Sequence, residues 1–297
     1  MTLGIGAMCQ TAQCVLMVAD MRGSFNDPSF PPHEHIGKQY DLPFGFLANT
    51  AGEKAICQSM SSELYSQIEH ITDKDNLRHD HIRDAMKETQ YLEFRYRAEQ
   101  KMKFELATTI AEWKAMPKAS LHYRRCQKLL KKYYLNMQLT VGGFLSNGSP
   151  VLLTAHGNEP PEIEEIAVIG SGADAAWKVL ADRGQNAHFG IVRSVLHLHE
   201  AMEEARRTDP YVGRCEGIVV LTPKQIRILG FDSDVVKELA AAFSGRDSAP
   251  LDDDGQRFQQ LMAALFEPGV TKEEYAAGLR RRPRPTQSAS QTSMGQQ

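Results

Sequence analysis

The chain has 297 residues, of which 42% are hydrophobic and 24% charged, as in a globular protein with a substantial core. Its 34 basic and 37 acidic residues nearly balance, so the overall charge does not favour nucleic-acid binding. No stretch approaches the roughly 18 apolar residues of a membrane span, and the N-terminus lacks a signal-peptide pattern. We therefore expect a soluble, cytoplasmic protein.

The first part of the chain alternates short apolar runs with turns. The runs MTLGIGAMC and CVLMVADMR flank the polar QTAQ and predict a hairpin. A proline-bearing loop follows, and KQYDLPFGFLANTAG then predicts two short strands broken at Pro43 and Gly45. From residue 53 onward the pattern is helical, with apolar residues at every fourth position: Ile56, Met60, Leu64 and Ile68.

The rest of the chain repeats this change from strands to helices. We predict a helical tract from about 76 to 113, a basic helix around 122–135, three strands, helices at about 173–183 and 189–207, and a final hairpin. Separate blocks of strands and helices favour an α+β fold, in which two antiparallel sheets between helix pairs form a four-layer αββα sandwich. We assign residues 1–280 to one domain and 281–297, rich in Pro, Ser and Gln, to a disordered tail.

The cysteines and histidines give no pattern for a disulfide framework or a metal site. The five cysteines are scattered without a CxxC motif, so we predict reduced, mostly buried thiols. Histidines two residues apart on a helix point to nearly opposite faces, so we predict solvated side chains for the helical pairs. A loop pair could bind metal only adventitiously. The pairs are His33 and His35 in the loop, and His79 with His81 and His197 with His199 in helices.

Thr2 is the first candidate for chemistry. If Met1 is removed, the chain begins with a hydroxyl nucleophile whose own α-amine can act as base, because that amine has an unperturbed pKa of about 7.7–8.0. Many proteins begin with Met-Thr, so by itself Thr2 indicates only an ordinary second residue before a strand.

Four motifs follow Thr2 in a fixed order. Ala19 to Arg22 read ADMR after the second strand, and Lys38 precedes NTAG, which ends at Gly52, fourteen residues later. IGSGADAAWKVL then contains Ser171, and RTDPYVG contains Asp209. Over about residues 2–230, this series resembles the proteasome-type N-terminal-nucleophile (Ntn) hydrolases, the family of proteasome β subunits and their simpler bacterial relatives.

The resemblance implies an Ntn-hydrolase fold and a catalytic set. Thr2 would be the nucleophile. A buried Lys38 would favour the deprotonated forms of the Thr2 hydroxyl and α-amine, and Asp20 would pair with the lysine. The N–H of Gly52, at a strand-to-helix junction, would hold the oxyanion. Ser171 and Asp209 would orient the amine and move protons. The ordinary interpretations are a solvated Lys38, a turn glycine at position 52 and a loop cap at position 209.

Some features depart from the family pattern. The spacing from Thr2 to Asp20 is about two residues longer, and a one-residue slip in a strand reverses the face of each side chain. Val212 stands where the family has a serine, and Leu3 replaces a small hydroxyl residue. The helical region 76–135 is longer than the usual helix pair, so we interpret it as a projecting insertion.

The resemblance therefore implies a threonine-type endopeptidase that cleaves polypeptides inside a self-compartmentalised homo-oligomeric ring. It implies no cofactor or metal, and an ATP-dependent unfoldase as partner for folded substrates. Two alternatives stay open: a catalytically silent scaffold subunit of the same fold, and an Ntn-type amidase that acts on a non-peptide amide, because fold does not fix substrate.

Overall fold

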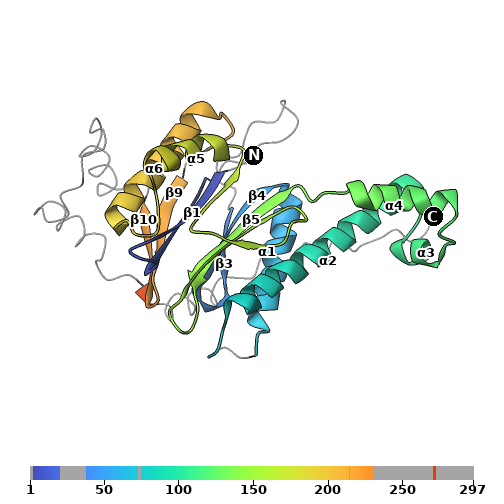
Figure 1. The fold of residues 1–297 in the computed structure, drawn as a ribbon, viewed down its shortest axis with the longest axis horizontal. Coiled ribbons are helices and arrows are strands. Elements are labelled where there is room, and N and C mark those ends of the chain that lie inside the picture. The colour runs from blue at the N-terminus through green and yellow to red at the C-terminus, as the bar shows by residue number, and fades with distance from the viewer. Residues whose placement is uncertain (1–2, 21–37, 73–74, 214, 231–269, 272–297) are drawn as a thin grey trace, which may run out of the picture.

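The computed structural model describes residues 3–20, 38–72, 75–213, 215–230 and 270–271. Two antiparallel sheets form its centre (Figure 1). The six-stranded sheet has the order β11-β10-β9-β2-β1-β8, and the five-stranded sheet has the order β3-β4-β5-β6-β7. The six strands are β1 (Leu3–Cys9), β2 (Cys14–Asp20), β8 (Ile166–Gly170), β9 (Cys215–Leu221), β10 (Gln225–Gly230) and β11 (Val270–Thr271). The five are β3 (Gln39–Leu42), β4 (Phe46–Gly52), β5 (Met137–Phe144), β6 (Pro150–His156) and β7 (Glu162–Ile163), with the 3₁₀ turn η1 (Pro43–Gly45) between β3 and β4.

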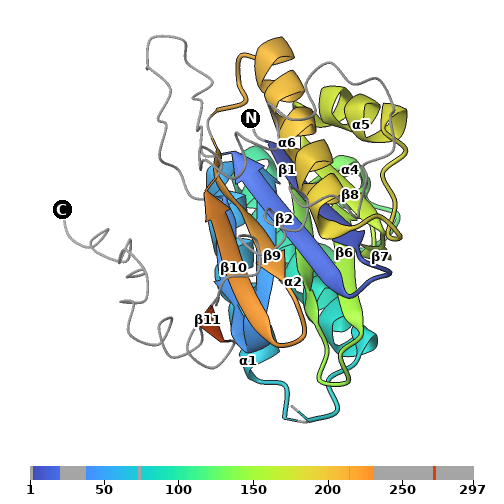
Figure 2. The same cartoon turned by 90° about the vertical axis from the view of Figure 1, so that its left-hand side faces the viewer.

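The sheets pack face to face, and helices cover both outer faces (Figures 1 and 2). Helices α5 (Ala173–Asp182) and α6 (Ile191–Thr208) lie on the six-stranded sheet. Helices α1 (Lys54–Glu69) and α2 (His79–Leu106) lie on the five-stranded sheet. Three apolar cores separate these layers, one under each helix pair and one between the sheets. The predicted α+β class, with two antiparallel sheets covered by helices, is confirmed.

The longer first hairpin closes through a left-handed turn. Gln10, Thr11 and Ala12 have φ of 51°, 54° and 62°, a region that non-glycine residues seldom adopt. Backbone N–H groups of Gln10 and Thr11 donate to the carbonyls of Phe189 and Ala187, both at 2.7 Å. These bonds fix the turn against the loop before α6, so the additional residues are accommodated without disturbing the pairing of β1 with β2.

The predicted helical tract over 76–113 is two helices. Ala107 has φ 47° and ends α2, and α3 (Ile110–Ala115) begins after the cap Thr109, which exchanges hydrogen bonds with Glu112. Helix α4 (Leu121–Lys132) follows. We call residues 98–132, the end of α2 together with α3 and α4, the helical arm; α3 and α4 project from the sandwich in Figure 1.

Contacts between α3 and α4 hold the tip of the arm. The indole of Trp113 stacks on the ring of Tyr123, with centroids 5.3 Å apart, and its Nε1–H donates to the Tyr123 carbonyl at 3.3 Å. Thr108 Oγ1 lies 2.7 Å from His122 Nε2. The arm is therefore an ordered helical unit.

One histidine prediction is wrong. His197 is 5% exposed, and its Nδ1 lies 2.7 Å from Gln185 Oε1. Burial, with Arg193 and Arg183 nearby, lowers the pKa of His197 to about 4. The ring is therefore buried rather than solvated, and it is neutral at pH 7.

Other predictions are confirmed in part or lie outside the described residues. Four of the cysteines are free and buried: Cys9, Cys14, Cys57 and Cys126. The side chain of Cys215, the His33–His35 loop and the predicted tail at 281–297 lie outside the described residues. In the described part, no helix combines the length and apolar character needed to cross a membrane.

Candidate active site

The candidate site is built around the carboxylate of Asp20, which ends β2 and is fully buried. The Nζ of Lys38 lies 2.9 Å from its Oδ1 and 3.0 Å from its Oδ2. The backbone N–H of Leu3 donates to Oδ1 at 2.7 Å, and that of Gly213 donates to Oδ2 at 2.9 Å. Both oxygens therefore carry hydrogen bonds, as a buried anion requires.

Lys38 reaches this carboxylate from the other sheet. It directly precedes β3, and its carbonyl accepts a hydrogen bond from the N–H of Thr50 in β4 at 2.9 Å. Only 7% of Lys38 is exposed, so the interpretation of a solvated edge-strand lysine is wrong. Each charge compensates the desolvation of the other, and the ion pair joins the two sheets at this point.

Thr2 lies outside the described residues, but the structure locates its sequence neighbour, Leu3. The N–H of Leu3 binds the same Oδ1 of Asp20 as the lysine ammonium does. Leu3 is also the register partner of Gly170, the residue before Ser171. Ser171 is exposed in the turn between β8 and α5. The backbone next to Thr2, the Asp20 carboxylate and the Ser171 turn are therefore neighbours.

Asp209 is connected to the site less directly. It caps the C-terminus of α6, and its Oδ1 accepts the N–H of Tyr211 at 2.9 Å, which agrees with a loop-capping role. Four residues later, Gly213 donates its N–H to Asp20. The turn after α6 therefore reaches the carboxylate through the backbone of Gly213, a contact that sequence reasoning missed because any residue type can make it.

Val212 replaces a polar contact with apolar packing. It is buried in the same cluster as Leu3 and Ala205. A Cβ at Gly172 would lie 2.7 Å from the Cγ2 of Val212, so the missing side chain lets the turn at 171–172 close on the valine. The position where the resembled family has a serine thus belongs to the core.

Gly52 lies at the predicted strand-to-helix junction, as the last residue of β4 before α1. Its φ is +121°, and a Cβ at this position would be 2.3 Å from the carbonyl oxygen of Asn136. The same carbonyl accepts the N–H of Glu53 at 2.9 Å. Both the dihedral angle and the close approach of the backbone require glycine here.

Helix α2 also holds this junction. Arg97 donates from Nε to Glu93 at 2.7 Å, and its NH1 lies 3.8 Å from the carboxylate of Glu53, the residue after Gly52. The buried Glu93 carboxylate also accepts the hydroxyl of Ser59 in α1 at 2.8 Å. The sequence contained no motif for this network, which links α2 to the Gly52 junction.

Asn49 links the two sheets by hydrogen bonds. From β4 its Nδ2 donates to the carbonyls of Ile5 at 3.3 Å and Val18 at 3.0 Å, which belong to β1 and β2. Its Oδ1 accepts from Gln39 Nε2 at 3.0 Å. A Cβ at Gly4 would be 3.1 Å from the Cβ of Asn49, so a glycine permits this approach. The amide occurs in the NTAG motif, but the motif did not indicate its role.

A second nucleophile lies near Lys38 but is held neutral. Burial raises the pKa of the Cys57 thiol to about 11, although Thr50 and Lys38 act in the opposite direction. Burial also raises the pKa of Tyr40 to about 12. Cys57 is therefore a thiol at neutral pH and a poor nucleophile.

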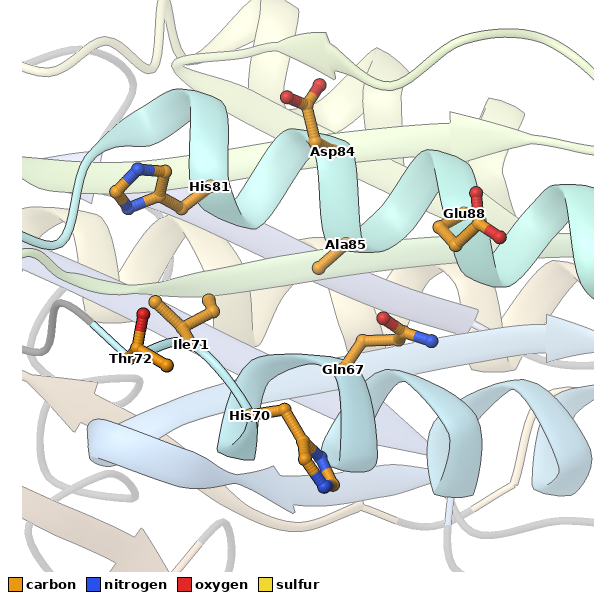
Figure 3. A pocket seen from close by; sticks show the side chains of 8 residues that line it. All are labelled: Gln67, His70, Ile71, Thr72, His81, Asp84, Ala85 and Glu88. Carbon is orange, nitrogen blue, oxygen red and sulfur yellow. The ribbon is translucent and has the colours of Figure 1, made fainter.

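A separate hollow of about 510 Å³ lies between the end of α1 and the start of α2 (Figure 3). None of its lining residues is a predicted site residue. In Figure 3 the side chains of His70 and Asp84 point in different directions, and His70 Nδ1 lies 2.6 Å from the carbonyl of Ser66. Within the described residues, no group of three or more His, Cys, Asp or Glu side chains is arranged to hold a metal ion.

No protein-family model matches this chain, and no curated protein matches its sequence. The function is therefore inferred from the sequence motifs and the geometry of the site.

Proposed function

We propose that this chain is a threonine-type peptidase with the αββα fold of the Ntn hydrolases, in which Thr2 is the nucleophile once Met1 is removed. The observation that carries the proposal is the shared carboxylate of Asp20. One of its oxygens binds both the Lys38 ammonium and the N–H of Leu3. The residue before Leu3 is Thr2, and consecutive Cα atoms are about 3.8 Å apart.

In this mechanism the hydroxyl of Thr2 attacks the carbonyl carbon of a peptide bond, and the α-amine of the same residue accepts the hydroxyl proton. The protonated amine then donates to the leaving amine, and an acyl-enzyme remains. Water, deprotonated by the amine, releases the acyl group and regenerates the hydroxyl. Atoms and charges balance without a cofactor or a metal.

The ion pair supports this chemistry electrostatically. The ammonium of Lys38 favours the neutral form of the α-amine and the developing negative charge on the attacking oxygen. Asp20 holds the ammonium in place, and its negative charge compensates the cost of burying the ammonium. Gly52 would donate its N–H to the oxyanion beside the N-terminus of α1, where the helix dipole favours negative charge. Ser171 and Asp209 would orient the amine.

We further propose that the active chain is a homo-oligomer, such as a ring that encloses its sites, with unfolded polypeptide as substrate. An ATP-dependent unfoldase would then deliver folded substrates. These assignments follow from the resemblance.

One observation favours the alternative of a catalytically silent scaffold. Val212 is 2% exposed and packs in the core at the position of the family serine. A hydroxyl that would orient the amine is therefore replaced by an apolar side chain, which reduces the support for proton transfer.

Intact mass spectrometry after incubation with a threonine-reactive β-lactone tests the proposal. We expect the wild-type chain to lack Met1 and to gain one inhibitor mass, mapped by peptide fragmentation to Thr2. Thr2→Ser keeps a hydroxyl and should still be labelled, whereas Thr2→Ala should not be. Retained Met1 with no adduct, or an adduct at another residue, would contradict the peptidase and favour the scaffold.

A further inference from the structure

The second half of the helical arm carries charge of one sign. Seven cations and no acidic residue lie between 114 and 132, and all seven are exposed. No ion pair involves any of them within the part of the chain that the structure describes. They are Lys114, Lys118, Arg124, Arg125, Lys128, Lys131 and Lys132.

Helix α4 gathers five of these cations on one face. At 3.6 residues per turn, positions 124, 125, 128, 131 and 132 fall within an arc of about 120°. The opposite side of α4, where Cys126 is buried, faces the rest of the arm. Leu121 lies within the same arc as the cations and is 66% exposed. We call this surface the basic face.

The opposite charge occurs along one edge of the five-stranded sheet. Four glutamates and no basic residue lie between 159 and 165, around the edge strand β7. Glu159, Glu162 and Glu165 are exposed, and no ion pair involves them in the described residues. Ile163 stands among these carboxylates and is 58% exposed. We call residues 159–165 the acidic edge.

We propose that the basic face of one chain docks on the acidic edge of a second copy. The two surfaces are complementary in charge, and each has one exposed aliphatic side chain among its charges: Leu121 on the basic face and Ile163 on the acidic edge.

A second copy fits better than a long polyanion such as nucleic acid. Asn158 donates to the carbonyl of Tyr133, just after α4, at 2.8 Å, and Glu159 follows it directly. The acidic edge therefore begins at the base of the arm, where its carboxylates would repel a long phosphate backbone that continues past the basic face, whereas a second copy contributes only the few carboxylates of its own acidic edge. A second copy instead presents an acidic edge to each basic face.

The contact joins two different surfaces. A two-fold dimer makes it twice, with each basic face on the acidic edge of the other copy, whereas a head-to-tail arrangement makes it once per pair and repeats into a ring or a filament. The inference deepens the self-association proposed above and rests on that part of the proposal alone. Its readout is assembly size, so its failure leaves the labelling of Thr2 unaffected.

Sedimentation velocity on the full chain tests the contact in 50 mM and 500 mM salt. We expect the wild type to associate in low salt and to dissociate in part in high salt, because exposed charges are screened. Reversing the basic face (R124E, R125E, K128E, K131E, K132E) or the acidic edge (E159K, E162K, E165K) should weaken association about 100-fold or more, because like charges then face each other.

Variants in which the charges of the two surfaces are exchanged provide the decisive experiment. A chain with both surfaces reversed should associate again, and an equal mixture of the two singly reversed chains should form mixed assemblies. Reversal of four ion-paired cations elsewhere (R83E, K87E, R206E, R207E) is the matched control and should leave assembly size unchanged. Circular dichroism checks that each variant is folded.

Three results would overturn the proposal. The first is a wild-type chain that stays monomeric at tens of micromolar in low salt. The second is association that survives both single reversals, or that the double reversal fails to restore. The third is loss of binding to a single-stranded 20-nucleotide DNA or to anionic lipid vesicles on reversal of the basic face, with assembly size unchanged.

Discussion

In the sandwich, the carboxylate of Asp20 is fully buried and binds the Lys38 ammonium and two backbone N–H groups, whereas residues 114–132 of the arm expose seven cations and contain no acidic residue. Buried charge must be matched within the chain, because desolvation costs several kcal/mol per ion. An exposed charge stays hydrated and needs no partner within the chain, so it is available to bind another molecule. The difference distinguishes the proposed site for chemistry from the proposed surface for assembly, and the following variants test it.

The largest effect is expected for Asp20→Ala. It removes the carboxylate that binds the buried Lys38 ammonium and two backbone N–H groups, and breaking a buried ion pair costs about 3–5 kcal/mol. Urea-induced unfolding followed by circular dichroism measures the free energy of unfolding. The double variant with Lys38→Met should recover part of the loss, because the buried ammonium is then removed together with the carboxylate that bound it. A loss below about 1 kcal/mol in the single variant would show that the pair is not held as described.

Gly52→Ala should be the next most destabilising change, by roughly 2–4 kcal/mol, because it combines a strained φ with a collision against the Asn136 carbonyl. Gly148→Ala is the matched control. Its φ is +82°, and nothing lies within 4 Å of the added Cβ, so it carries only the dihedral cost of about 1–2 kcal/mol. Equal losses in the two variants would contradict the close approach at the junction.

A pH-dependent loss of up to about 3 kcal/mol is expected from His197. The folded chain protonates this ring near pH 4, and the unfolded chain near pH 6.5. The unfolded state therefore binds more protons between these values, so the free energy of unfolding falls as pH decreases from about 6.5 to 4. Urea unfolding of His197→Gln over this range should show a smaller decrease than the wild type; parallel curves would exclude a buried neutral ring.

Arg97→Met tests the connection between helix α2 and the Gly52 junction. It removes one partner of the buried Glu93 but leaves the Ser59 hydroxyl, so we expect a loss of about 1–2 kcal/mol. Hydrogen exchange measured by mass spectrometry should increase in peptides that cover residues 47–57. Arg97→Lys keeps the charge and should show a smaller increase. Unchanged exchange in both variants would mean that Arg97 does not hold this junction.

The smallest effect on stability is expected when the five cations of α4 are all replaced by Gln. Their charges are exposed and unpaired within the described residues, and repulsion between neighbours on the helix offsets their favourable interaction with its C-terminal dipole. The free energy of unfolding should change by less than about 1 kcal/mol. A larger loss would mean that these cations stabilise the fold itself and would remove the contrast with Asp20.

Much of the fold was predictable, because the spacing of apolar residues indicates which side of a strand or helix is buried and turn residues indicate where it ends. The hairpin at QTAQ, the helix marked by Ile56 and Met60, and the strand break at Pro43 all occur where the sequence indicates. The break at Ala107 was not predictable, because an alanine favours the helix and only the local φ ends it. His197 was predicted to be solvated because it and His199 point to different faces of a helix and cannot share a metal ion, but this spacing does not report that His197 is buried beside Gln185.

The site was predictable only where a side chain carried the information. Asp20 and Lys38 are ionisable residues in a recognisable order, and the structure brings them into contact. The N–H of Gly213 and the cross-sheet amide of Asn49 were missed, because backbone groups and single amides leave no pattern in a sequence. The position of Val212 in the core likewise needed coordinates.

By itself, the sequence determined most of the strands and helices and the segregation of charge between residues 114–132 and 159–165, because periodicity and charge are local properties. The resemblance implied that Asp20 pairs with a buried Lys38, but only the tertiary structure showed that this ion pair joins two different sheets next to Leu3. It also decided which charges are matched and which stay exposed. Those features depend on the packing of the two sheets and on the direction of the arm, and contacts between distant segments are set by the whole fold.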